Sequence, residues 1–172
     1  MVVLKEKRFT LRPYREGDEL QLRQAINDPR VVRQIVNVPN PYSMRDARSW
    51  VQRNLCSERS RKPDMINWAI VVDGKIVGGL GLHRIESPRA EIGYWLAPAY
   101  WGRGIMTAAV RLVVRFGFEK RKLRRIYALV FPVNKASQRV LEKNGFRLEG
   151  RLRKNVLKDK KPRDDLLYAK IR

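Results

Sequence analysis

Hydrophobic and polar residues near the start of the chain alternate first with the period of a strand and then with that of a helix. The segment RFTLRPY (8–14) alternates with period two, which predicts a strand. In GDELQLRQAIND (17–28) the apolar residues recur at helical spacing, and Pro29 ends that pattern. A strand followed by a helix is therefore predicted before residue 30.

Two local signals define the elements that follow. Ser43 with Asp46 three residues later forms a capping box, which predicts that a second helix begins there and runs through MRDARSWVQRNLCSERS. The apolar stretch 66–85 is divided by Asp73-Gly74, a turn pair that favours a tight hairpin. We expect two antiparallel strands on either side of this turn.

The second half of the chain alternates between strands and helices. Strands are predicted over 89–97, 124–131 and 166–171, and helices over 107–120 and 134–146, where Gly145 occupies the stop position. Much of the strand pairing must be antiparallel, because the pattern is not a regular repeat of strand, helix and parallel strand. The fold class is therefore a mixed α/β one of the α+β type.

Length and composition favour one intracellular domain. The chain has 172 residues, of which 44% are hydrophobic, and it shows no internal repeat, so a single domain over 1–172 is expected. It lacks an apolar run long enough to span a membrane, and charged residues occupy the positions where a signal peptide would be apolar, so a cytoplasmic protein is expected. Cys56 is the single cysteine and has no metal-ligand partners at useful spacing, so neither a disulfide nor a metal site is predicted.

The charge of the chain is strongly positive. Lys and Arg number 38 against 17 Asp and Glu, which gives a formal net charge of +21, and the excess is concentrated after residue 110. Two basic segments stand out, EKRKLRR (119–125) and RLRKNVLKDKKPR (151–163). Such a field attracts phosphate-rich partners and repels polycations, although a generally basic surface explains it equally well.

The segment YWGRGIMTAAV (100–110) places two glycines and an arginine directly before a helical pattern. Backbone amides at a helix start lack intrahelical acceptors, and together they bind anions. Gly102 and Gly104 remove side chains that would keep a diphosphate away, and Arg103 adds positive charge. Neither the phosphate loop that ends in Gly-Lys-Ser/Thr nor the three-glycine dinucleotide loop matches this spacing. The alternative is a purely structural turn.

In this loop the sequence resembles the GNAT superfamily of acetyl-CoA-dependent N-acetyltransferases, whose signature is Gln/Arg-x-x-Gly-x-Gly/Ala. The six positions here are Trp101 to Met106, and of the strict pattern only Gly104 is kept. The resemblance extends over nearly the whole chain, from FTLRPYREGDE through AEIGYWLAPAYWGRGIMTAAV and NKASQRVLEKNGF to LLYAKI. These segments look like the branch that contains the ribosomal-protein serine/alanine N-acetyltransferases.

The resemblance implies a GNAT fold, with a mixed, mostly antiparallel sheet of about seven strands flanked by about four helices. It implies acetyl-CoA as the cofactor, with its pantetheine arm beside the strand that contains Trp95 and Leu96 and paired with the backbone near these two residues. An amide there would polarise the thioester carbonyl. The cofactor-binding residues carried over in this way are Trp95, Leu96, Trp101, Gly102, Arg103, Gly104, Ile105, Met106, Thr107, Asn134 and Ser137.

The same resemblance suggests two catalytic residues. Ser137 would donate a proton to the departing thiolate, and Leu141 stands where many relatives have a tyrosine. Glu91 matches a strand glutamate that some members use as a general base, directly or through water. GRLRKNVLKD (150–159) lacks the carboxylate that the ribosomal branch can carry between Gly150 and Asp159. The alternative for Glu91 is a surface glutamate, and His83 is expected to be an ordinary strand or loop residue.

The acceptor is the least determined part of the prediction. An α-amine with a pKa of ~8 is deprotonated more easily than a lysine at ~10.4, which favours a protein N-terminus such as that of a ribosomal protein. Two alternatives remain, namely acetylation of a small-molecule amine and a non-catalytic acyl-CoA-binding module that docks on RNA or a ribonucleoprotein. Association with ribosomes or RNA through the basic surface is expected, as a monomer or homodimer and without membrane binding.

Overall fold

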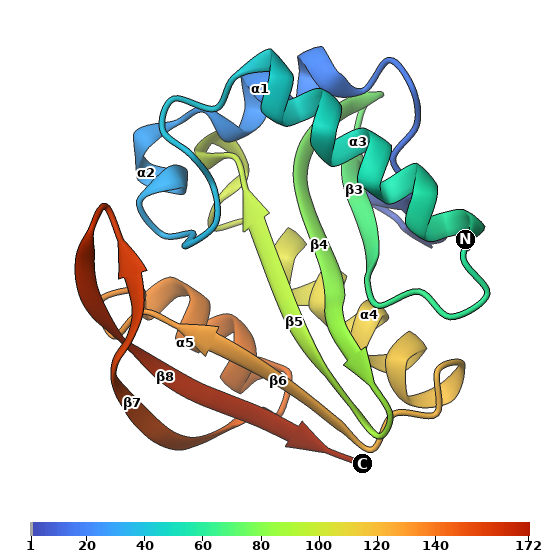
Figure 1. Cartoon of the computed structure of the whole chain (residues 1–172). Helices are drawn as coiled ribbons and strands as arrows, with labels where there is room; N and C mark the ends of the chain where they lie inside the picture. The colour runs from blue at the N-terminus through green and yellow to red at the C-terminus, as the bar shows by residue number, and fades with distance from the viewer. Residues whose placement is uncertain (1) are drawn as a thin grey trace.

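One open sheet runs through the whole molecule (Figure 1). The computed structural model describes residues 2–172. The sheet has eight strands in the order β1-β2-β3-β4-β5-β6-β8-β7, and only the pair β5–β6 is parallel. The strands are β1 (Leu4–Glu6), β2 (Phe9–Arg12), β3 (Ile66–Val72), β4 (Lys75–Glu86), β5 (Arg89–Leu96), β6 (Arg125–Val130), β7 (Arg147–Lys158) and β8 (Lys161–Ile171). The predicted mixed, mostly antiparallel sheet is confirmed, with one strand more than expected.

Helices cover both faces of the sheet (Figure 1). The two core clusters separate them, because α1 (Glu19–Ile26), α2 (Pro29–Val32) and α3 (Met44–Arg59) contribute to one cluster, and α4 (Ile105–Glu119) and α5 (Lys135–Lys143) to the other. A short 3₁₀ helix, η1 (Pro98–Tyr100), connects β5 to the glycine loop. Among residues 2–172, no helix combines the length and apolar character needed to cross a bilayer.

The local signals in the sequence are confirmed. Ser43 Oγ accepts a hydrogen bond from the Asp46 amide at 3.2 Å, and the Asp46 carboxylate accepts one from the Ser43 amide at 2.8 Å, so the capping box opens α3. Asp73 and Gly74 both have positive φ in the turn between β3 and β4. Gly145 has φ +77° directly after α5, a backbone conformation that favours glycine.

The residue pattern did not predict β1, β7, α2 or the short η1. β7 is exposed along most of its length, so it has no alternating apolar pattern, and its pairing with β8 holds it in the sheet. α2 is a single turn in which Pro29 occupies the first position, while Asp28 caps it by accepting a hydrogen bond from the Arg30 amide. The proline that ends the first helical pattern therefore also begins a new turn.

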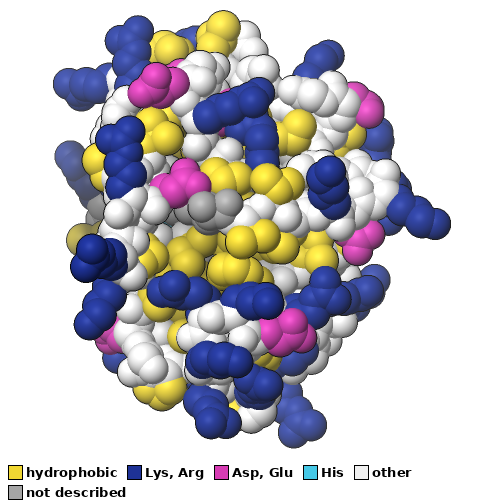
Figure 2. All heavy atoms as spheres, turned by 90° about the vertical axis from the view of Figure 1, so that its right-hand side faces the viewer, with side chains coloured by type: hydrophobic (Ala, Val, Ile, Leu, Met, Phe, Trp, Pro, Cys, Tyr) yellow, Lys and Arg dark blue, Asp and Glu magenta, His cyan; other side chains and the backbone are white. Residues whose placement is uncertain are grey.

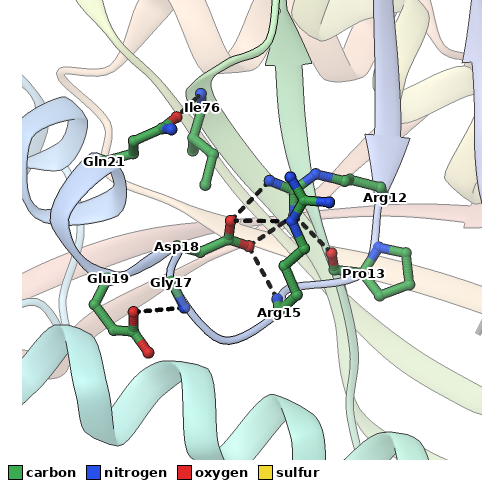
Figure 3. A network of polar contacts seen from close by, with 8 residues as sticks. All are labelled: Arg12, Pro13, Arg15, Gly17, Asp18, Glu19, Gln21 and Ile76. Atoms are coloured by element: carbon green, nitrogen blue, oxygen red, sulfur yellow. Dashed lines mark hydrogen bonds and ion pairs between the residues drawn. The ribbon is translucent and has the colours of Figure 1, made fainter.

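A partly buried ion pair connects the start of α1 to the sheet (Figure 3). Arg12, at the end of β2, binds the Asp18 carboxylate through both terminal nitrogens, at 2.7 and 2.8 Å. Further along the helix, Gln21 Oε1 accepts a hydrogen bond from the Ile76 amide of β4 at 2.9 Å. These contacts hold α1 against the end of β2 and the start of β4.

The parallel strands β5 and β6 separate after a short stretch of pairing. Only Arg89, Ala90 and Glu91 pair with β6, and from there the two strands diverge (Figure 1). Beyond these paired residues, the backbone groups of β5 and β6 that face each other have no neighbouring strand. The opening lies between the start of α4 and the start of α5.

Candidate active site

The opening between β5 and β6 contains a cavity of about 730 Å³. All but one of the predicted cofactor-binding residues line it, namely Trp95, Leu96, Trp101, Gly102, Gly104, Ile105, Met106, Thr107, Asn134 and Ser137. Arg103 is the exception, since its guanidinium lies over the ring of Tyr100, 5.4 Å from the ring centroid. Residues of α2 and of the segment after it close the cavity from the other face of the sheet.

The glycine loop presents free backbone donors to this cavity. Gly102 and Gly104 have φ of +73° and +74°, which is the left-handed conformation that side chains disfavour. Ala108 is the first residue of α4 whose amide reaches a helical acceptor, the Gly104 carbonyl at 3.1 Å. Within the described chain, the amides of Ile105, Met106 and Thr107 thus have no intrahelical acceptor, and this is the donor arrangement that binds phosphate oxygens. The site fits a diphosphate.

The backbone of β5 supplies further hydrogen-bonding groups. The Ala97 amide donates to Val77 on β4 at 2.8 Å, and antiparallel pairing alternates from there, so the backbone groups of Trp95 point at β4. The expectation that the backbone of Trp95 pairs with the pantetheine arm is therefore wrong, because β4 already occupies that edge. Those of Tyr94 and Leu96 point into the opening. Trp101 Nε1 donates to the Leu96 carbonyl at 2.6 Å. The amide of Leu96 and both backbone groups of Tyr94 therefore face the cavity.

A pair of hydroxyl groups lies at the start of α5. Asn134 caps the helix, with its Oδ1 accepting a hydrogen bond from the Ser137 amide at 3.1 Å. Ser137 Oγ lies 2.8 Å from the hydroxyl of Tyr94 on β5. Burial strongly raises the pKa of Tyr94, which keeps its phenol protonated. Ser137 is therefore positioned at the cavity with a protonated neighbour.

Tyr94 is a site residue that sequence reasoning missed. Strand alternation puts it on the same face of β5 as Ile92 and Leu96, the face that packs against α4 and α5. That alternation was visible in the sequence and could have placed Tyr94 toward the helices. The contact between Tyr94 and Ser137, which are 43 residues apart, could not be predicted from the sequence.

Leu141, which stands where many relatives have a tyrosine, is fully buried in the core.

Glu91 lies on the opposite face of β5 and does not line the cavity. Its side chain is 22% exposed, and Arg84 Nη1 approaches its Oε2 to 3.2 Å, but no hydrogen-bond donor is well oriented toward that oxygen. Burial raises the pKa of Glu91, and this effect is opposed by Arg84 and Tyr127. His83, its neighbour across the β4–β5 pair, has its pKa lowered by burial and by Arg84. A carboxyl group with a raised pKa is suited to accept a proton near neutral pH.

Comparison with known proteins agrees with this geometry. Residues 8–147 match the family model of the acetyltransferase (GNAT) domain. Over 104 residues the chain is 46% identical to "Probable N-acetyltransferase YjcK" of Bacillus subtilis (strain 168), a match that covers 58% of each protein. It is 30% identical over 152 residues to the ribosomal-protein-serine acetyltransferase of Escherichia coli (strain K12), which covers 87% of this chain and 79% of that protein.

A solved structure extends the similarity to the fold and the cofactor. RimJ of Mycobacterium smegmatis in complex with CoA-disulfide has a TM-score of 0.85 and 30% identity, and the match covers 95% of this chain and 81% of that one. The expected resemblance to the ribosomal-protein branch is confirmed at this level of similarity. These matches agree with the free amides of the glycine loop and with the separation of β5 from β6. They show that the chain belongs to the GNAT family of acetyltransferases and uses acetyl-CoA.

Proposed function

We propose that this enzyme transfers the acetyl group directly to the α-amine of a protein N-terminus, in a ternary complex. The observation that carries the proposal is the Ser137–Tyr94 hydroxyl pair at 2.8 Å, inside the cavity that also presents the free amides of α4. Cys56, the single cysteine of the chain, is on α3 and does not line the cavity, so no thiol is positioned to carry an acetyl group.

Each residue has a role that follows from its position. The amides of Ile105, Met106 and Thr107 bind the diphosphate, and the β5 backbone groups that face the opening bind the pantetheine arm. The amide of Leu96 polarises the thioester carbonyl, whose carbon the amine attacks. Ser137 gives its hydroxyl proton to the sulfur as the C–S bond breaks and regains a proton from solvent water. Glu91 takes the proton of the attacking amine through water.

A surface suited to a phosphate-rich partner lies next to the site. The hairpin that joins β7 to β8 extends toward α2 (Figure 1), and Lys158 Nζ donates to the Val38 carbonyl at 3.3 Å. Much of the basic segment 151–163 therefore borders the side of the sheet from which an acceptor would enter. The other basic segment, 119–125, lies at the far end of α4, so it does not border this entrance.

Basic side chains are not restricted to this entrance. Figure 2 shows the opposite side of the molecule, where Lys and Arg surround a central group of hydrophobic side chains and far outnumber Asp and Glu. The positive field is therefore general, and it favours encounter with ribosomes over encounter with polycationic amines. The similarity to a ribosomal-protein-serine acetyltransferase supports the same acceptor class.

We expect the enzyme to sediment with ribosomes at low salt and to be released as salt rises. Binding through several phosphates loses roughly 0.7 to 0.9 log units of affinity per contact for each tenfold rise in salt. The measurement is co-sedimentation at two salt concentrations, combined with thiol release on a panel of N-terminal peptides and free amines. If the enzyme does not bind ribosomes but acetylates a free amino acid efficiently, its acceptor is a small-molecule amine and the proposed protein acceptor is wrong. Tight cofactor binding without turnover of any amine would favour a non-catalytic module.

The role of Glu91 predicts a specific pH dependence. A general base acts when ionised, so with a raised pKa its activity falls as pH decreases through that raised value. Glu91→Gln should lower kcat/KM by about 100-fold at neutral pH and remove this acidic limb. Arg84→Gln removes a charge that lowers the pKa of Glu91, so the limb should move to higher pH. The measurement is kcat/KM against pH for both variants, and an unchanged limb in Glu91→Gln would exclude this role.

A further inference from the structure

Charged side chains around the cavity are all positive. Among the described residues that line it, the charged ones are Arg30, Lys135, Arg139 and Lys143, and neither an aspartate nor a glutamate is present. Two of these four already have polar partners. Arg30 forms a two-point ion pair with Asp28 at 2.8 and 3.0 Å, and Lys135 Nζ donates to Gln138 at 3.4 Å. Arg139 and Lys143 are exposed and form no ion pair within residues 2–172.

The direction of α5 along the cavity is given by contacts at its two ends. Near its start, Ser137 meets Tyr94, where the thioester would react. Just past its end, Asn144 Nδ2 donates to the Thr107 carbonyl in the first turn of α4 at 3.1 Å. The helix therefore runs from the reactive end of the site to the diphosphate end, and Lys143 lies at the latter.

Helical spacing puts the two free cations on one face. Arg139 and Lys143 are four residues apart, which corresponds to about 6 Å along the axis, so both side chains can reach a single phosphate group. In the proposed function, the free amides at the start of α4 already bind the diphosphate. Acetyl-CoA carries one further phosphate, on the 3′ position of its ribose.

We infer that Arg139 and Lys143 bind the 3′-phosphate of the cofactor and make the enzyme discriminate against cofactor that lacks it. This inference rests on the proposed placement of the diphosphate at α4. It assigns the cations of α5 to cofactor selection, separate from the basic segments proposed to meet the ribosome. A charge-assisted contact to phosphate changes affinity by about tenfold or more.

The test is calorimetric titration of the full chain with acetyl-CoA and with acetyl-3′-dephospho-CoA at constant salt. The wild-type protein should bind acetyl-CoA at least about tenfold more tightly. In Arg139→Gln/Lys143→Gln this ratio should fall close to one, mainly through weaker binding of acetyl-CoA. Arg45→Gln/Arg48→Gln removes the same two charges from the exposed face of α3, away from the cavity, and should keep the wild-type ratio.

Two results would overturn the inference while leaving the diphosphate site intact: equal affinity of the wild-type protein for both compounds, or full discrimination in the α5 double variant. An equal loss of discrimination in the α3 control would show that the general positive field is responsible, and would also overturn it. Failure of the wild-type protein to bind either compound would refute the diphosphate site itself and the inference with it.

Discussion

Gly104→Val should abolish detectable binding of acetyl-CoA, with a rise in Kd of about 100-fold or more. Gly104 has φ +74°, a conformation that costs an L-residue about 1–2 kcal/mol and a β-branched one more. A Cβ at this position would meet only Arg8 Nη2 at 3.5 Å, which is ordinary van der Waals contact, so the added Cβ causes no clash. The backbone must instead leave the left-handed region, and the amides of Ile105 and Met106 then turn away from the diphosphate. Calorimetry with acetyl-CoA measures the effect.

Gly17 offers a matched control for this substitution. It has φ +92° in the loop before α1, and a Cβ there would meet nothing within 4 Å. Gly17→Val therefore introduces comparable backbone strain without touching the cavity. We expect both variants to lose a similar amount of thermal stability, while only Gly104→Val loses affinity. If Gly104→Val binds acetyl-CoA with unchanged affinity, the glycine loop does not bind the cofactor.

Ser137→Ala should lower kcat by about 100-fold while changing acetyl-CoA affinity by no more than about twofold, because a proton donor acts mainly in the transition state. Tyr94 makes the expectation more specific. Its phenol stays protonated and lies 2.8 Å from Ser137 Oγ, so it can donate to that oxygen and leave the hydroxyl hydrogen of Ser137 directed at the sulfur. Tyr94→Phe should then cause a smaller loss, about tenfold, since it disturbs only the orientation of Ser137.

The double variant distinguishes the two hydroxyls. If Tyr94 acts through Ser137, Ser137→Ala/Tyr94→Phe should be no slower than Ser137→Ala alone, because residues that act as a unit are not additive. Single-turnover kinetics with a peptide acceptor would measure the chemical step directly. A larger loss in Tyr94→Phe than in Ser137→Ala would make the tyrosine the direct donor. Equal losses in kcat and in cofactor affinity would make Ser137 a binding residue.

Elements with strong local signals could be predicted from the sequence alone. The capping box at Ser43 and the turn at Asp73-Gly74 depend on side chains and φ values within a few residues, and both lie where the pattern indicated. The same holds for the glycine loop, where the left-handed conformations of Gly102 and Gly104 and the free amides of α4 are local consequences of the chain. The backbone donors of the candidate anion site could therefore be predicted before any tertiary contact was known.

Only the tertiary structure decided how these parts meet. β5 and β6 are parallel and pair over three residues before they separate, and nothing local in either strand indicates where pairing stops. The approach of Tyr94 to Ser137 depends on that separation, because the two residues come from different elements on opposite sides of the opening. β7 likewise depends on its backbone hydrogen bonds with β8, because few of its own side chains are buried. The sequence determined the donors of the site through local backbone chemistry, whereas hydrogen bonds between distant segments decided the cavity in which they act.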